Sequence, residues 1–95
     1  MIEEQYLTKL KSLIEQKIGK EPVKIFIYGS SLERDNFRDI DLGIEGQLSA
    51  RQISELREYF EESTFPYQID IIDFNQVSPD FKKEVLNSKM LWIKN

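Results

Sequence analysis

The sequence predicts a small α/β (α+β) domain in which a mixed β-sheet of three to four strands is packed by helices. Short runs of β-branched and aromatic residues alternate along the chain with segments whose apolar residues recur every three or four positions. The chain has 95 residues, of which 40% are hydrophobic, and this suffices for one core. We therefore expect a single domain over residues 1–95.

The first predicted elements are a helix and a buried strand. Apolar residues follow the helical spacing over residues 6–18, and Gly19 predicts the end of that helix. Residues 23–28, VKIFIY, are almost continuously apolar, which is typical of a central strand. Gly29 ends this strand, and the polar residues 31–38 predict a turn of helix followed by a loop.

The middle of the chain repeats the alternation of strand and helix. Residues 39–44, DIDLGI, predict the second strand. Ser49, with Gln52 three residues later, forms a capping-box pattern at the start of a helix whose apolar stripe reaches Phe60. Residues 67–73, YQIDIID, predict the third strand.

The last part of the chain predicts one more helix and one more strand. Ser78 is a capping residue, and Pro79 suits the first helical position. The tail KMLWIK, residues 89–94, predicts a short strand. The apolar side chains of the helix, namely Phe81, Val85 and Leu86, are expected to face inward.

Composition excludes several kinds of site. The chain has no cysteine and no histidine, which rules out disulfides, thiolate or imidazole zinc sites and Ser-His or Cys-His nucleophiles within it. A bound metal must have oxygen ligands, which favours Mg²⁺ or Mn²⁺. The net charge of −4 argues against nucleic-acid binding. No apolar run suits a membrane span or signal peptide, so a cytoplasmic protein is expected.

Two aspartates in the second predicted strand are the first candidate site residues. Side chains two positions apart on a strand point to the same face, so Asp39 and Asp41 project together, while Ile40 and Leu42 project toward the core. A divalent cation would offset the repulsion between the two carboxylates. Asp70 on the third strand is the candidate third acid. Three carboxylates on adjacent strands are what a two-metal phosphoryl-transfer site needs.

A phosphate-binding turn is the second candidate. Gly29 allows close approach of the backbone to a phosphate, and Ser30 adds a hydroxyl donor. Alone, the Gly-Ser pair could be an ordinary turn, and the Asp-x-Asp pattern could belong to an edge strand with one solvent-exposed face. Together, the two motifs favour a site that binds a metal and a phosphate. Arg34 and Arg38 could neutralise triphosphate charge, although a solvated surface role is the commoner one.

Asp73 competes with Asp70 for the third position. The two residues are three positions apart, so on a regular strand their side chains point to opposite faces of the sheet. Only one of them can therefore share the face of Asp39 and Asp41. Asp73 lies at the end of the strand, where a turn role is more common. Asp70 is therefore the predicted third acid.

The segment YGSSLERDNFRDIDLGI, followed by QIDIID, resembles the minimal nucleotidyltransferases (MNT) of the DNA polymerase beta superfamily, of the antitoxin type. The resemblance implies the polymerase-beta-like nucleotidyltransferase fold and Mg²⁺-dependent transfer of a nucleoside monophosphate, AMP from ATP. It also implies that Gly29 and Ser30 hold the triphosphate, that Asp39 and Asp41 bind the metals, and that Asp70 helps to activate the acceptor hydroxyl.

The resemblance further implies a toxin–antitoxin pair. Small members of the family act beside HEPN-domain toxins, which they bind and adenylylate, so a HEPN-type protein is the expected partner. The sequence departs from the family in its eight-residue spacer and in Ser31, where an arginine is common. A catalytically weak antitoxin that only occludes its toxin is the alternative hypothesis. Transfer to a small molecule or an RNA end, and a homo-oligomer, also remain open.

Overall fold

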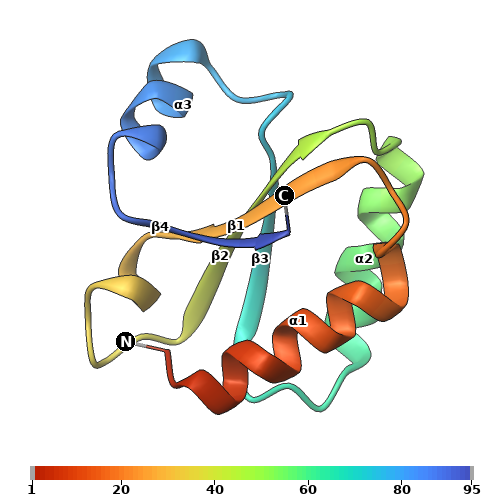
Figure 1. Ribbon diagram of the computed structural model, residues 1–95, viewed down its shortest axis with the longest axis vertical. Helices are drawn as coiled ribbons and strands as arrows, with labels where there is room; N and C mark the ends of the chain where they lie inside the picture. Colours follow the sequence, from red (N-terminus) through yellow and green to blue (C-terminus); the bar gives the residue numbers. More distant parts are fainter. Residues whose placement is uncertain (1, 95) are drawn as a thin grey trace.

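The computed structural model describes residues 2–94 of the chain (Figure 1). The order of the elements is the predicted one, and the tail forms the fourth strand. The elements are α1 (Glu4–Ile18), β1 (Val23–Tyr28), the 3₁₀ turn η1 (Ser30–Leu32), β2 (Asp39–Gly46), α2 (Ala50–Glu62), β3 (Gln68–Asp73), α3 (Pro79–Leu86) and β4 (Met90–Lys94). The predicted α/β fold is confirmed.

The four strands form one mixed sheet with the order β3-β2-β1-β4. The strand β1 pairs antiparallel with both β2 and β4, and β2 pairs parallel with β3. A parallel pair needs a crossover connection, and α2 provides it between β2 and β3. The two apolar strands β1 and β2 are therefore central, and β3 and β4 lie at the edges.

One side of the sheet, which we call the helix face, packs against α1 and α2. Alternate side chains of the strands point to this side and are almost completely buried. With Leu10, Ile14 and Leu56 from the helices they form the main core. The strand residues of this core include Ile25, Ile27, Ile40, Leu42, Ile44 and Ile71.

The opposite side, which we call the carboxylate face, carries Asp39, Asp41 and Asp70 at one end and α3 at the other. Under α3, the rings of Phe26 and Phe74 meet edge to face with centroids 4.9 Å apart. Together with Tyr28 and Val85 they form a second, smaller core cluster. A salt bridge of 2.6 Å between Lys82 of α3 and Glu45 of β2 ties the helix to this end. Figure 1 shows α3 standing apart from α1 and α2.

The prediction that Phe81, Val85 and Leu86 all face inward is wrong for two of the three. Val85 is buried, whereas Phe81 is 38% exposed and Leu86 is 48% exposed. Successive residues of a helix point about 100° apart, and α3 covers only one end of the sheet, so one side of the helix suffices for packing. Phe81 still touches the cluster edge to face, with its ring centroid 6.3 Å from that of Tyr28.

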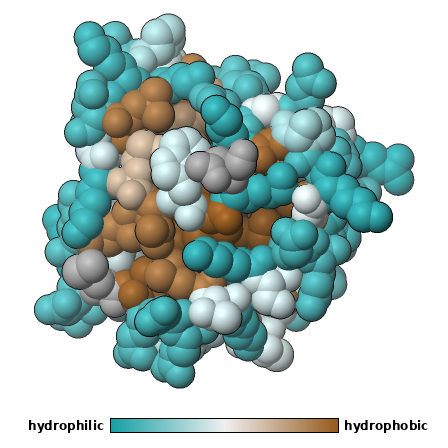
Figure 2. Space-filling view, viewed as in Figure 1, coloured by the Kyte–Doolittle hydropathy of each residue, from teal (hydrophilic) through white to brown (hydrophobic). Residues whose placement is uncertain are grey.

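The edge strand β4 is apolar and incompletely covered. Trp92 is 41% exposed, although its ring packs 5.3 Å from that of Phe26. Leu91 and Ile93 are partly buried on the other side of the strand. Figure 2 shows apolar side chains gathered across the middle of the molecule, where β4 and α1 lie in Figure 1.

The two predicted helix caps are confirmed. The Gln52 N–H donates to Ser49 Oγ at 3.1 Å, and the Ser49 N–H donates to Gln52 Oε1 at 2.9 Å, which completes the capping box. The Phe81 N–H donates to Ser78 Oγ at 3.2 Å. Within residues 2–94, no helix has both the length and the apolarity to cross a membrane.

Candidate active site

The candidate site lies where the end of β1 meets the first residues of β2 and β3. The strand register pairs Tyr28 with Asp41 across the antiparallel β1–β2 ladder, and Asp41 with Asp70 across the parallel β2–β3 ladder. Ile40 and Leu42 are fully buried on the helix face, as alternation predicted. Asp41 is half-buried, and Asp39 is exposed.

The three carboxylates are close enough to influence one another. The pKa of Asp41 is raised above the ordinary value of an aspartate, first by burial, then by the negative charge of Asp70 and then by that of Asp39. Gln68 Nε2 donates a hydrogen bond of 3.3 Å to Asp70 Oδ1 and holds this side chain on the same face. Asp41 is therefore the centre of a strongly negative patch.

Gly29 brings the phosphate-turn candidate directly against Asp41. Its backbone has φ +85° and ψ −154°, a conformation almost restricted to glycine. A Cβ atom added to Gly29 would lie 2.6 Å from Asp41 Oδ2. The turn and the carboxylate thus share one space, in which a side chain at position 29 would collide with the acid.

After Gly29 the chain forms η1, in which the Leu32 N–H donates to Gly29 O and the Arg34 N–H donates to Ser30 O. The first N–H groups of such a turn have no partner inside it, so they are suited to an anion. The next side chain, Ser31, is 1% exposed, and its hydroxyl has no hydrogen-bond partner among residues 2–94. Ser31 is therefore packed inside, whereas Ser30 borders the site and is partly exposed.

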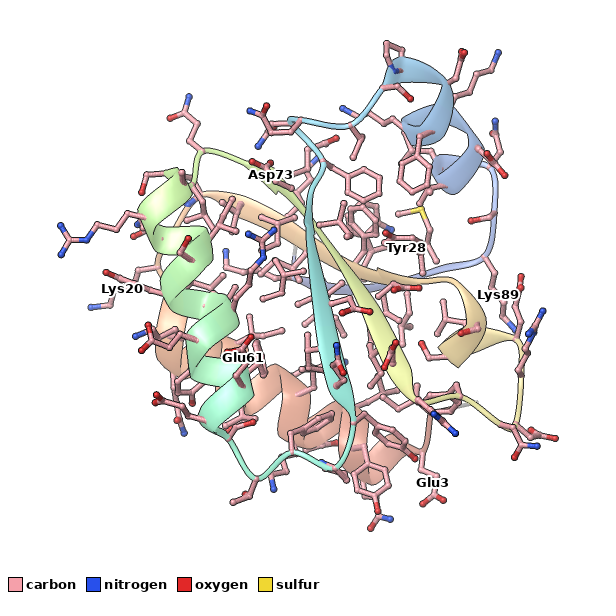
Figure 3. The ribbon with its side chains drawn as sticks, turned by 180° about the vertical axis from the view of Figure 1, so that it is seen from behind. Glu3, Lys20, Tyr28, Glu61, Asp73 and Lys89 are labelled. Atoms are coloured by element: carbon pink, nitrogen blue, oxygen red, sulfur yellow. The ribbon has the colours of Figure 1, made fainter. Side chains whose placement is uncertain are left out.

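Tyr28 forms the wall between the carboxylates and the aromatic cluster. Its pKa is raised to about 12, first by burial, then by the charge of Asp41 and then by that of Asp70. The phenol therefore stays protonated at neutral pH. Figure 3 shows Tyr28 below α3 among aromatic rings. Tyr28 therefore packs in the aromatic cluster, and its ring also borders the site.

The other candidate residues from the sequence, Arg34, Arg38 and Asp73, lie outside the group formed by Gly29, Asp41 and Asp70. Arg34 and Arg38 are exposed in the segment that joins η1 to β2. Asp73 pairs with Ile44 in the ladder, three positions beyond the Asp41–Asp70 pair. Its Oδ1 accepts hydrogen bonds from the backbone and side-chain nitrogens of Asn75 at 2.9 and 3.0 Å. Asp73 thus has the turn role that its position predicted.

The donor chemistry of the site suits a hard cation. The three acids supply oxygen ligands only, and Mg²⁺ is bound in proteins through one or two carboxylates together with phosphate oxygens and water. The negative patch around Asp41, whose pKa is raised by its neighbours, is the kind of charge that a divalent cation neutralises. Within residues 2–94, no three acidic side chains already converge as a complete set of ligands.

Sequence reasoning missed the space beside β3. A hollow of about 640 Å³ is lined by Asp41 and Asp70 and continues past Arg57 of α2. No motif points to Arg57, because its contact with β3 depends on how α2 packs. The side of the sheet on which Tyr28 lies could have been predicted from the sequence, because strand alternation directs Tyr28 away from the face that buries Ile27.

Comparisons with known proteins identify the family and the fold. The family model for polymerase beta, nucleotidyltransferase, matches residues 8–95. The fold is similar to that of a chain in the solved complex of the tri-AMPylated Shewanella oneidensis HEPN toxin with MNT antitoxin, with a TM-score of 0.67 and 18% identity over 97% of this chain and 71% of that chain. No curated protein matches significantly in sequence. The chain belongs to the polymerase beta nucleotidyltransferase family, as its motifs predicted.

Proposed function

We propose that the chain is a Mg²⁺-dependent nucleotidyltransferase that transfers AMP from ATP to a hydroxyl group of a HEPN-type protein partner. The observation that carries the proposal is the meeting of Gly29 with Asp41, which is itself in register with Asp70. The Gly29 turn, Asp41 and Asp70 lie together at one end of one sheet face, which supports their proposed roles as phosphate turn, metal ligand and third acid.

The residues have distinct roles in the proposed reaction. The N–H groups that follow Gly29 and the Ser30 hydroxyl hold the triphosphate, with Arg34 and Arg38 as the nearby cations. The acceptor oxygen forms a bond to the α-phosphorus, and the bond from that phosphorus to the bridging oxygen breaks. Pyrophosphate leaves with the electron pair. The proton of the hydroxyl passes to the Asp70 carboxylate and from there to solvent.

Asp39, Asp41 and Asp70 would hold Mg²⁺, or Mn²⁺ in its place. The metal supplies charge neutralisation for the triphosphate and for the carboxylates. Asp39 is exposed, so its side chain has room to turn toward Asp41 when a cation enters.

The partner is inferred from the similar fold. The structure that this chain resembles contains a HEPN toxin that is tri-AMPylated and bound to MNT antitoxin. A small acidic chain with the same fold is suited to the same pairing. We therefore propose that this chain is the antitoxin of a HEPN/MNT pair.

Labelled ATP tests the proposed activity directly. The chain is mixed with Mg²⁺, ATP carrying a label on the α-phosphate, and a candidate HEPN-type partner protein. We expect the label on the partner, and we expect at least a thousandfold slower labelling with Asp39→Asn combined with Asp41→Asn. Asp73→Asn is the matched control, because it removes an acid of the same sheet that lies outside the site. Equal labelling by the double variant would refute the proposal.

A binding-only antitoxin is the second candidate function. It is favoured by Ser31, which is buried where the family commonly has an arginine. This hypothesis expects toxin neutralisation to persist in EDTA and in the double Asp→Asn variant. If neutralisation is lost in that variant while the complex stays intact, the binding-only hypothesis fails.

A further inference from the structure

The outer edge of β3 is open. The sheet order places β3 at one end, and within residues 2–94 its ladder partner is β2 alone. An open strand edge presents a row of backbone N–H and C=O groups that can pair with another extended chain. In this chain the open edge belongs to the strand that carries Asp70.

Two hydrogen bonds identify the peptide groups that face outward. The Gln68 N–H donates to Arg38 O at 3.3 Å, so Gln68 turns its amide toward the β2 side. Arg57 of α2 approaches from the opposite side, and its Nη2 donates to Ile71 O at 2.9 Å. Because peptide groups alternate between the two edges of a strand, the N–H groups of Ile69 and Ile71 face outward.

The hollow of about 640 Å³ follows this edge and reaches the carboxylates. Its lining includes Glu61 of α2, Phe65 in the connection before β3, and Asp70 and Asp41. Ile71, which also lines it, points to the helix face, whereas Asp70 points to the carboxylate face, so the hollow curves around the edge. Figure 3 shows Glu61 on the side of α2 that is next to β3.

We propose that this edge groove binds the protein acceptor as an extended segment. The segment pairs with the outward peptide groups of Ile69 and Ile71 and presents its hydroxyl side chain to Asp70. Directly opposed residues on neighbouring strands have Cβ atoms about 4.5–5.5 Å apart. A side chain of the added strand on the carboxylate face therefore lies beside Asp70. This inference rests on the proposed function and specifies how the acceptor is held.

The chemistry of the groove favours a polypeptide over a nucleic acid. Peptide groups at a strand edge recognise another main chain, whereas phosphates would meet the negative charges of Glu61, Asp41 and Asp70. Arg57 is a cation of the groove, but its guanidinium is engaged with Ile71 O. That contact occupies one outward carbonyl and so limits the added strand to a short segment.

Amide hydrogen exchange tests the pairing without any chemical step. Exchange is measured for the chain alone and for the chain with saturating HEPN-type partner, in the absence of ATP. We expect the Ile69 and Ile71 amides to slow at least tenfold in the complex, whereas the inward amides of Gln68 and Asp70 change little. Unchanged exchange of Ile69 and Ile71 in a complex that forms overturns this inference alone. If no complex forms, both the inference and the proposed partner fail.

A proline substitution tests the link to transfer. Ile69→Pro removes the outward N–H and leaves the inward ladder in place, because proline is tolerated on edge strands. Ile69→Ala trims the same side chain but keeps the N–H, and it is the matched comparison. We expect labelling of the partner to be at least tenfold slower in the proline variant than in the alanine variant, with equal affinity for ATP. Equal labelling rates overturn the inference, and the exchange measurement decides the case if the proline variant does not fold.

Discussion

The two faces of the sheet are built from the same four strands and differ in burial and in charge. On the helix face, Ile40, Leu42 and Ile44 are fully buried under α1 and α2. On the carboxylate face, Asp39 is exposed and Asp41 is half-buried, and the pKa of Asp41 is raised by burial, Asp70 and Asp39. One face is a finished apolar core, and the other keeps like charges together.

The difference between the two faces shows how a small chain can carry a charged candidate site and still have a stable apolar core. Strand side chains alternate, so neighbouring residues of β2 serve different purposes without sharing space. Most of the apolar burial that stabilises the fold lies on the helix face, and a smaller cluster lies under α3 on the other. The repulsion among the acids lies on the other face and weakens the fold only modestly. The comparison predicts that adjacent substitutions in β2 have opposite effects on stability.

The largest effect is expected at Leu42. Leu42→Ala removes a fully buried side chain and leaves a cavity, which should lower the free energy of unfolding by about 3 kcal/mol. Asp41→Asn, one residue earlier, removes one of three like charges and should not lower it. Urea unfolding followed by circular dichroism compares the two variants. A large loss of stability in Asp41→Asn would mean that the carboxylate face is structural after all.

Gly43 tests the end of the carboxylate face that α3 covers. A Cβ at this position would collide with Phe26 Cζ and would lie 2.8 Å from Phe74 Cε1. We expect Gly43→Ala to lower the free energy of unfolding by about 2 kcal/mol, because the rings must shift in a packed cluster. Phe26→Leu removes the colliding atom, so the double variant should lose less than the sum of the single variants. Additive losses in urea unfolding would contradict this packing.

Gly29 tests the open end of the same face. Gly29→Ala should cost about 1–2 kcal/mol, because φ +85° with ψ −154° is strained for any residue with a Cβ. The added methyl group would also push Asp41 aside. We therefore expect weakened ATP binding as well, measured by calorimetry in Mg²⁺. Gly43→Ala is the control, since it destabilises the same face without touching the turn, and equal loss of ATP affinity in both variants would argue against a phosphate turn.

Much of this arrangement could be predicted from the sequence, because it depends on local rules. The parity of Asp39 and Asp41 follows from strand alternation, and the caps at Ser49 and Ser78 follow from short motifs. Parity allows only one of Asp70 and Asp73 on the shared face, and the choice of Asp70 followed from the place of Asp73 at the strand end. The register of β2 with β3 pairs Asp70 with Asp41, and Asp73 accepts the turn hydrogen bonds from Asn75. The catalytic role of these acids stays a prediction.

The features that escaped prediction depend on tertiary packing. The exposure of Leu86 follows from how little of the sheet α3 covers. The hydrogen bond from Arg57 to Ile71 O depends on the placement of α2 beside an edge strand. Buried Ser31 looks in sequence like any polar turn residue, yet it packs inside. At Leu86 the apolar pattern predicted burial that the packing does not provide, and no pattern at Arg57 or Ser31 predicted their contacts.

The smallest expected effect is the pH dependence caused by Asp41. Its pKa in the folded chain is raised above 3.8, so the folded state binds this proton more tightly than the unfolded state does. The contribution to stability is fully present below about pH 4 and is lost as the pH rises through the raised pKa. In EDTA, the difference in unfolding free energy between wild type and Asp41→Asn should therefore shift in favour of the variant from pH 4 to pH 7. Urea unfolding at each pH measures this difference, in which ionisations common to both proteins largely cancel. A difference that does not change with pH would mean that Asp41 ionises as easily in the folded chain as in the unfolded one, and the contrast between the two faces would then be one of packing and not of charge.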